Sequence, residues 1–246
     1  AFFKTYYGPN NATVAIVGDI NPKEVIALIE QTFGKIPAAP PIPSLVTEEP
    51  PQRGERRVEI EFDAEPALAI GSHKPTIGHP DDFVFDVIDE VLTEGVTSWL
   101  YSTLVRDKRL AASVLSDTNY PGVRAPNLFV IAATPLAPHS VTEVETAIYE
   151  ELDRLKTEPI SAKEFERVLN GLDADLVRSL RSNSGLASQL AFYQTVAGTW
   201  RYVLNARDRI AAVTPADVQR VAAQYLTKPN RTVGVLVKKA QDKKMA

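Results

Sequence analysis

The sequence predicts an α+β fold, because its strands and helices come in separate groups along the chain. Strands are expected at residues 57–62, 67–72, 113–119, 128–134 and 230–237. Helices are expected at residues 81–92 and 97–108, and most of the chain between the fourth strand and the last is helical as well. A doubly wound parallel sheet would instead alternate strand and helix one by one.

The strands are predicted from their side-chain patterns. Residues 57–62 read Arg-Val-Glu-Ile-Glu-Phe, in which polar and apolar side chains alternate with a period of two, as in a half-exposed strand. Residues 67–72 are expected to form the neighbouring strand. Two later strands, at residues 113–119 and 128–134, flank a turn at residues 120–126 that contains proline and glycine.

The helices are predicted from apolar periodicity and from capping residues. Residues 81–92 place apolar side chains on one face that is expected to be buried. These side chains are Phe83, Val84, Val87, Ile88 and Val91. Three later helices begin with a hydroxyl followed three residues on by a carboxylate, the pattern of a capping box. The pairs are Ser140 with Glu143, Ser161 with Glu164, and Thr214 with Asp217.

Residues 1–36 carry the elements of an incomplete domain. Residues 12–17 form a β-branched apolar run that predicts a buried strand. Asn21 and Pro22 then supply the cap and the first position of a helix that ends at Gly34. Its expected buried face holds Val25, Ile26, Leu28, Ile29 and Phe33. One strand and one helix cannot bury such faces alone, so an earlier part of this domain is expected to precede the chain.

Prolines divide the chain into parts. Residues 37–51 contain six prolines and few large apolar residues, the composition of a semi-rigid, extended connector. We therefore predict that residues 1–36 close one domain, that residues 37–55 form a linker, and that residues 56–246 form a second domain. The start of the chain at Ala1, without an initiator methionine or a signal-peptide pattern, also leads us to expect a piece of a longer polypeptide.

Composition excludes several classes of function. Lys and Arg total 27 against 31 Asp and Glu, with a formal net charge of -4, so no nucleic-acid partner is expected. The basic run at the C-terminus, Lys238, Lys239, Lys243 and Lys244, is expected to be a solvated tail. The absence of cysteine excludes disulfides, thiolate metal sites and cysteine nucleophiles. No apolar stretch is long enough for a membrane span.

The histidines do not form a metal-binding pattern. A zinc site usually needs two histidines on one helix face and a third ligand. His73, His79 and His139 have no such spacing, and each is expected to be a solvated loop residue. The sequence therefore predicts no metal ligand in this chain.

No catalytic residue is predicted from local motifs either. The chain contains neither a Gly-x-Ser-x-Gly nucleophile elbow nor a glycine-rich phosphate loop. Asp81 with Asp82 and Glu150 with Glu151 are paired carboxylates, but both pairs fall at helix starts or on outer helix faces. Stabilisation by the helix dipole or by solvent is the expected role of these four side chains.

Several stretches together resemble one protein family. Residues 3–19 run from an aromatic helix end through Pro-Asn-Asn to an apolar strand and Gly-Asp, like the end of the first domain of pitrilysin/insulinase-type (inverzincin) zinc metallopeptidases. Residues 98–108 are similar to a leucine-rich helix of the next domain. Residues 212–226 and 230–233 resemble the family's C-terminal helix and last strand. Because the matches keep the family's order, the chain resembles the C-terminal, non-catalytic region of one half of such an enzyme.

The resemblance implies a fold and a function. Residues 56–246 would form a mainly antiparallel sheet with helices packed on one face. In the family, two halves close around a chamber that admits unfolded peptides, and zinc is bound by His-x-x-Glu-His in the first domain. This chain lacks that string, so zinc is expected in the full-length enzyme or its partner and not here. Secreted and periplasmic relatives favour a periplasmic location over a cytoplasmic one.

One residue of a second functional element is present. In one half of the family's enzymes, an arginine and a tyrosine seven residues apart help to bind the substrate and polarise its carbonyl. Arg106 matches the arginine and is the predicted substrate-binding residue. The tyrosine is missing, because Ser113 stands seven residues on, its neighbour is Ala112, and Tyr120 is too far along the strand.

Two functions remain open at this point. The chain is expected to be a non-catalytic domain of a zinc endopeptidase that acts on unfolded peptides, inactive alone, forming a chamber wall and meeting a second half in a homodimer or heterodimer. The alternative is a catalytically silent assembly subunit of the same family. A third hypothesis is a binding module unrelated to the family, in which case the matches to the family's segments, in the family's order, would be accidental.

Overall fold

The computed structural model describes residues 2–43 and 49–239. The chain forms two compact units, one from residues 1–51 and 176–204 and the other from residues 52–175 and 205–246. The predicted division at the proline-rich linker stays a prediction. Part of that linker, residues 44–48, lies outside the described residues, and so do Lys243 and Lys244 of the predicted solvated tail.

The second unit contains a five-stranded sheet. Its strands are β1 (Arg56–Phe62), β2 (Ala67–Lys74), β3 (Ala111–Tyr120), β4 (Asn127–Pro135) and β5 (Arg231–Lys238). The strand order is β1-β5-β2-β4-β3, and all neighbouring pairs are antiparallel except β1 with β5. The predicted α+β class and mainly antiparallel sheet are confirmed.

The prediction that β2 is the neighbour of β1 was wrong, because β5 lies between them. Leu236 of β5 pairs with Ile60 of β1 on one side and with Ala67 of β2 on the other. Val233 and Val235 of β5 are buried, whereas every residue of β1 is exposed. The apolar last strand therefore takes an interior position, and the charged strand takes the edge, where exposed charges discourage unwanted pairing.

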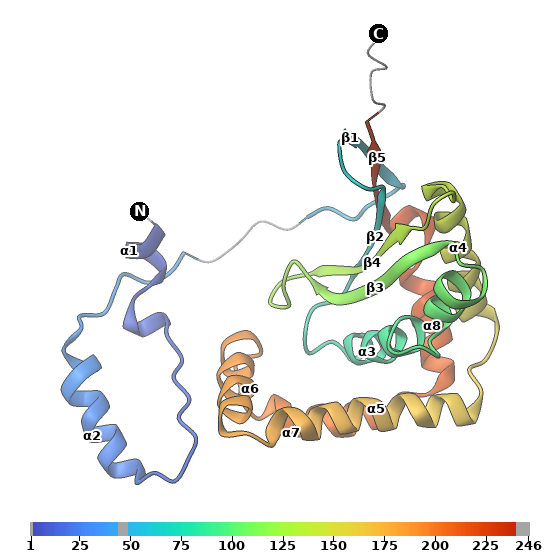
Figure 1. Cartoon of the computed structure of the whole chain (residues 1–246). Helices are drawn as coiled ribbons and strands as arrows, with labels where there is room; N and C mark the ends of the chain where they lie inside the picture. Colours follow the sequence, from blue (N-terminus) through green and yellow to red (C-terminus); the bar gives the residue numbers. More distant parts are fainter. Residues whose placement is uncertain (1, 44–48, 240–246) are drawn as a thin grey trace. The chain divides into compact units, whose positions relative to one another are not determined.

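Helices α3 (Pro80–Leu92), α4 (Val141–Thr157) and α8 (Pro215–Tyr225) pack against one face of the sheet (Figure 1). All five apolar side chains predicted for the inner face of α3 are buried. The ring of Phe85 on this helix lies 5.6 Å from that of Phe129 on β4 and 5.6 Å from that of Tyr225 on α8. These aromatic contacts join the helix layer to the sheet.

The remaining helices largely follow the predicted order. They are α5 (Ala162–Leu180), α6 (Asn183–Val196) and α7 (Tyr202–Ala211), with a π-helix at Tyr101–Asp107 and short 3₁₀ turns at Pro9–Asn11, Phe33–Lys35 and Lys228–Asn230. The capping boxes of Ser140 and Thr214 are confirmed. At Ser161 only half of the box forms: its hydroxyl accepts the amide of Glu164, but the Glu164 carboxylate accepts the indole N–H of Trp99, at 2.7 Å.

The first unit contains α1 (Phe2–Tyr6) and α2 (Pro22–Thr32). Asn21 caps α2 as predicted. Residues 12–17 are extended but pair with no strand in the described parts of the chain, and the predicted inner face of α2 is not buried. This agrees with the expectation that these two elements cannot bury their apolar faces alone. Leu28 is 60% exposed and Phe33 is 59% exposed. A strand needs a neighbouring strand and an apolar helix face needs a covering layer, and the described chain supplies neither.

Candidate functional site

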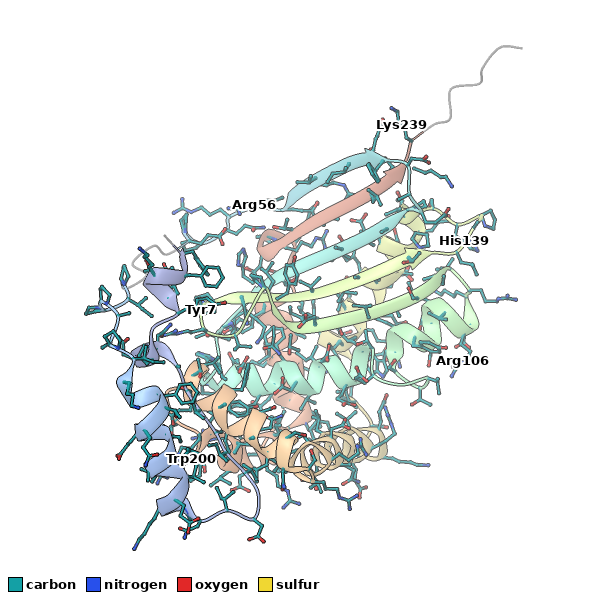
Figure 2. The ribbon with its side chains drawn as sticks, turned by 60° about the vertical axis from the view of Figure 1, so that its left-hand side comes forward. Tyr7, Arg56, Arg106, His139, Trp200 and Lys239 are labelled. Carbon is teal, nitrogen blue, oxygen red and sulfur yellow. The ribbon has the colours of Figure 1, made fainter. Side chains whose placement is uncertain are left out.

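Arg106 lies in the last turn of the π-helix, on the surface of the second unit (Figure 2). Its Nε donates to Oδ1 of Asp107 at 2.7 Å, and its Nη2 donates to Oδ2 of the same carboxylate at 3.0 Å. These hydrogen bonds raise the pKa of Arg106 and lower that of Asp107. The side chain of Arg106 is 54% exposed, and any further hydrogen-bond acceptor must compete with Asp107 for the guanidinium.

No tyrosine lies where the family's arginine–tyrosine pair would place it. Ser113 and Ala112 are exposed residues near the start of β3, the strand that follows Arg106. Tyr120 ends the same strand, seven residues beyond Ser113, which corresponds to roughly 23 Å along an extended chain. The structure therefore brings Tyr120 no nearer to Arg106 than the sequence suggested.

The three histidines lie on different elements. His73 was expected in a loop, but it belongs to β2, and its Nε2 lies 3.3 Å from Oε1 of Gln52. Nδ1 of His79 accepts the amide of Asp81 and caps α3, and Nδ1 of His139 lies 3.3 Å from the Glu143 carboxylate. Over residues 2–43 and 49–239, no group of three or more histidine or carboxylate side chains could hold a metal ion. These residues do not fit zinc.

Asp81 and Asp82 lie in the first turn of α3, as predicted, but the expectation that solvent accounts for them was wrong. Asp81 is buried and accepts hydrogen bonds from Arg220, at 2.7 Å, and from the hydroxyl of Tyr225, at 3.0 Å. Burial is the largest single influence and raises the pKa of Asp81, but these two hydrogen bonds and the positive charge of Arg220 together hold the pKa below its usual value. Burial and the bond to Asp81 raise the pKa of Tyr225 to about 12. Asp82 pairs with Lys74, whose side chain is fully buried.

The two carboxylates of the other predicted pair, Glu150 and Glu151, lie in different environments, one on the surface and one in the interior. Glu150 is exposed and forms an ion pair of 3.2 Å with Lys108. Glu151 is buried, contrary to the prediction, and accepts the hydroxyl hydrogen of Thr103 at 2.8 Å. It connects α4 to the π-helix that ends at Arg106 and Asp107. The role of Glu151 is therefore to hold that helix in place.

Three carboxyls of α3 were missed by the sequence analysis. Burial raises the pKa of Asp86 to about 7, that of Asp89 to about 6 and that of Glu90 to about 7, and neighbouring carboxylates add to each shift. The signal was available in part, because acids at positions 82, 86, 89 and 90 recur at helical spacing. Strongly shifted pKa values mark functional sites or structural charge clusters. In the part of the chain that the structure describes, these carboxyls belong to no metal-binding group, and their raised pKa values place their titration near neutral pH.

Comparison with known proteins decides the family. Residues 1–172, more than two thirds of the chain, match the family described as the peptidase M16 inactive domain. The chain belongs to this family. The predicted identity as the non-catalytic C-terminal region of a zinc-peptidase family is thereby confirmed. Within the described ranges of this M16 inactive domain, no helix is both long and apolar enough to cross a bilayer.

Two curated relatives resemble the M16 inactive domain over most of its length. The zinc protease PqqE of Helicobacter pylori is 29% identical over 228 residues, which cover 91% of this chain and 51% of the relative. An uncharacterized zinc protease of Streptomyces coelicolor is 27% identical over 239 residues, covering 92% of this chain and 50% of the relative. The chain therefore spans about half of the length of these relatives.

A solved structure supports the same assignment. The crystal structure of a protease from Helicobacter pylori superimposes on the M16 inactive domain with a TM-score of 0.90 at 28% sequence identity. The match covers 96% of this chain and 57% of the other. The fold described above is thus shared with a solved protease structure over nearly the whole chain.

Proposed function

We propose that this chain is the non-catalytic domain of a zinc endopeptidase that acts on unfolded peptides. In that role it forms one wall of the substrate chamber and pairs with a second, zinc-bearing half. The match of residues 1–172 to the peptidase M16 inactive domain carries the proposal. The relatives named zinc proteases are about twice as long as this chain, so the zinc ligands are assigned to residues outside it.

The exposed apolar surface of the first unit supports a paired half. A monomeric soluble protein rarely exposes large contiguous apolar patches. Large apolar side chains with exposures between 50% and 71% are concentrated in the first 36 residues: Phe2, Phe3, Tyr7, Val14, Ile26, Leu28, Phe33 and Ile36. Covering one such side chain completely contributes about 1.5 to 3 kcal/mol. This surface suits a covering protein layer.

The test is to combine this chain with the zinc-bearing half of its parent protein, produced separately. We expect a stable complex that hydrolyses unfolded peptides, with neither part active alone. Leu28→Glu should weaken the complex without changing the melting temperature of the isolated chain, because Leu28 is exposed there. Gln31→Glu, an exposed position on the same helix, adds the same charge and should leave the complex intact. Absence of binding would contradict the proposal.

A catalytically silent assembly subunit is the second candidate. It is favoured by one observation, that Arg106 has no tyrosine seven residues on and is instead engaged by Asp107. The same reconstitution separates the two functions. A stable complex that hydrolyses no peptide, even with zinc present, would support the silent subunit.

A further inference from the structure

Strand β1 is an open edge of the sheet. It lies outermost, beside β5, and no described strand pairs with its other side. All seven residues of β1 are exposed. Figure 2 shows Arg56 at the start of this edge, while Lys239 and His139 lie toward the opposite end of the sheet. An open edge of this length offers unpaired backbone groups to another extended chain.

The direction of the unpaired backbone groups follows from one hydrogen bond. The carbonyl of Phe62 accepts the amide of Lys239, so the backbone groups of Phe62 point toward β5. Successive residues of a strand direct their backbone groups to opposite sides. The N–H and C=O groups of Arg57, Glu59 and Glu61 therefore point outward, away from the sheet.

The edge is held firmly, although it is exposed. Arg57 donates two hydrogen bonds of 2.8 Å to Glu145 on α4, which fixes β1 to the helix layer. Just before the strand, Nε2 of Gln52 donates to the carbonyl of Arg231 at 2.6 Å, and Glu55 forms an ion pair with the same arginine. A strand that is already ordered loses little conformational entropy when it binds a partner.

The two faces of this edge differ in chemistry. Val58, Ile60 and Phe62 project on the face that carries no helices, and they are 54%, 56% and 62% exposed. Glu59 and Glu61 project on the helix-bearing face, and neither is paired with a basic side chain in the described part of the chain. A strand added beside β1 would therefore meet apolar side chains on one face and carboxylates on the other.

A hollow on the helix-bearing face adds a site for a long side chain. It has a volume of about 290 Å³ and is lined by Glu59, Val235 and Val237, together with the start of α4 at Ser140. Three basic residues also line it, but Arg57 is paired with Glu145, Lys238 with Glu65 and His139 with Glu143. The valines suit the aliphatic stem of a lysine or arginine, and the Glu59 carboxylate suits its charge.

We propose that the outer edge of β1 binds an extended peptide segment in which apolar and basic residues alternate. The peptide backbone bonds to Arg57, Glu59 and Glu61, its apolar side chains lie beside Val58, Ile60 and Phe62, and a basic side chain enters the hollow beside Glu59. The inference is independent of the proposed pairing with a zinc-bearing half, because the site lies within this chain.

A second copy of the chain fits this edge less well. In an antiparallel pairing that keeps the apolar faces together, Glu59 would lie opposite Glu55, Arg57, Glu59 or Glu61 of that copy. Three of these four are carboxylates, which repel it, and the fourth is already committed to Glu145. Charge complementarity therefore favours a basic strand over self-association.

The experiment measures binding of two labelled, capped peptides of about seven residues to the whole chain by fluorescence anisotropy. One peptide alternates lysine with valine, and the other alternates glutamate with valine. We expect the lysine peptide to bind more tightly by about tenfold or more. Its lysines would lie opposite the carboxylates of β1, whereas the glutamates of the other peptide would be repelled by them. Amide exchange should slow at Glu59 and Glu61 when the lysine peptide binds.

Two comparisons separate backbone recognition from charge. Glu59→Pro removes an outward N–H that β5 does not use together with the carboxylate, whereas Glu59→Gln removes the carboxylate charge alone. Proline is tolerated at such an edge position, so Glu59→Pro should keep the fold and weaken binding about tenfold more than Glu59→Gln does. The double variant Glu59→Lys with Glu61→Lys changes no backbone group and should reverse the preference to the glutamate peptide.

Equal binding of both peptides, or an unchanged preference in the double-lysine variant, would overturn the proposal. The proposal would also be overturned if the chain does not bind the lysine peptide but dimerises as its concentration rises, and if Glu59→Pro abolishes that dimerisation. The edge would then be assigned to a second copy of the chain.

Discussion

The guanidinium of Arg57 on β1 donates two hydrogen bonds of 2.8 Å to the carboxylate of Glu145 on α4, 88 residues further along the chain. Glu145 is buried and also accepts the hydroxyl hydrogen of Tyr149 at 2.7 Å. The hydrogen bond from Arg57 holds the pKa of Glu145 below its usual value, although burial opposes the shift. This pair connects an exposed edge strand to the helix layer.

We expect Glu145→Gln to lower the free energy of unfolding by about 1 to 3 kcal/mol, because it removes a charge-assisted pair of hydrogen bonds and leaves buried polar groups poorly matched. Urea unfolding followed by circular dichroism measures the change. Glu158→Gln is the control, since Glu158 forms an exposed pair with Arg154 and should cost less than about 1 kcal/mol. Equal effects of the two substitutions would contradict the assigned role of Glu145.

Lys74 should be more sensitive than any surface lysine. Its side chain is fully buried, pairs with Asp82 and lies 5.5 Å from the centre of the Phe85 ring. Lys74→Met leaves Asp82 without its buried partner and should cost about 3 to 5 kcal/mol. Adding Asp82→Asn should restore at least half of that loss, because the uncompensated charge is then gone. If Asp82→Asn restores none of the lost stability, the Lys74–Asp82 pair does not account for the destabilisation by Lys74→Met.

The carboxyls of α3 should make the protein more stable as the pH falls from about 8 to 5. Burial raises the pKa of Asp86 and Glu90 to about 7 and that of Asp89 to about 6, so the folded state binds protons that the unfolded state does not bind in this range. The free energy of unfolding then decreases as the pH rises through these pKa values.

Asp86→Asn tests this pH dependence. It removes one of the titrating groups, so it should raise the melting temperature at pH 8 and flatten its dependence between pH 8 and 5. Asp153→Asn, on the exposed surface of α4, is the control and should leave the pH profile unchanged. A variant profile with the slope of the original protein would show that Asp86 does not titrate in this range.

Arg106 should affect turnover more than stability in the assembled enzyme. Its side chain is exposed and, among the described residues, hydrogen-bonds to Asp107 and, at 3.5 Å, to the carbonyl of Val96. Arg106→Ala should lower kcat/KM for peptides by about tenfold or more while changing the melting temperature little, and Arg106→Lys should recover part of the loss. Asp107→Asn should increase peptide affinity, because it removes the competing charge. Unchanged kinetics in Arg106→Ala would make Arg106 an ordinary surface charge.

The isolated chain should bind no zinc tightly and hydrolyse no peptide. It lacks His-x-x-Glu-His, and its described residues contain no group of side chains suited to a metal ion. Metal analysis after dialysis, together with a peptide cleavage assay, checks this expectation. Stoichiometric zinc that survives dialysis, with activity lost on chelation, would contradict it.

Local patterns predicted the elements of the second unit well. The apolar face of α3, the caps at Ser140 and Thr214, and the strands β3 and β4 all follow from residues close together in the sequence. The pairing of β1 could not be predicted in this way, because its neighbour β5 is more than 160 residues away and no local signal specifies that contact. The incomplete cap at Ser161 has the same cause, because Trp99 competes for the Glu164 carboxylate.

The sequence by itself determined that the chain has no zinc motif and that its fold class is α+β. It also determined that Arg106 matches the arginine of the family's arginine–tyrosine pair while the tyrosine is missing. These depend on residue identity and on spacings of a few residues. Only the tertiary structure decided that Lys74 is buried against Asp82, that α3 gathers carboxyls with raised pKa values, and that β1 is an open, firmly held edge. Burial and charge pairing depend on contacts between distant segments, so they arise only when the chain is folded.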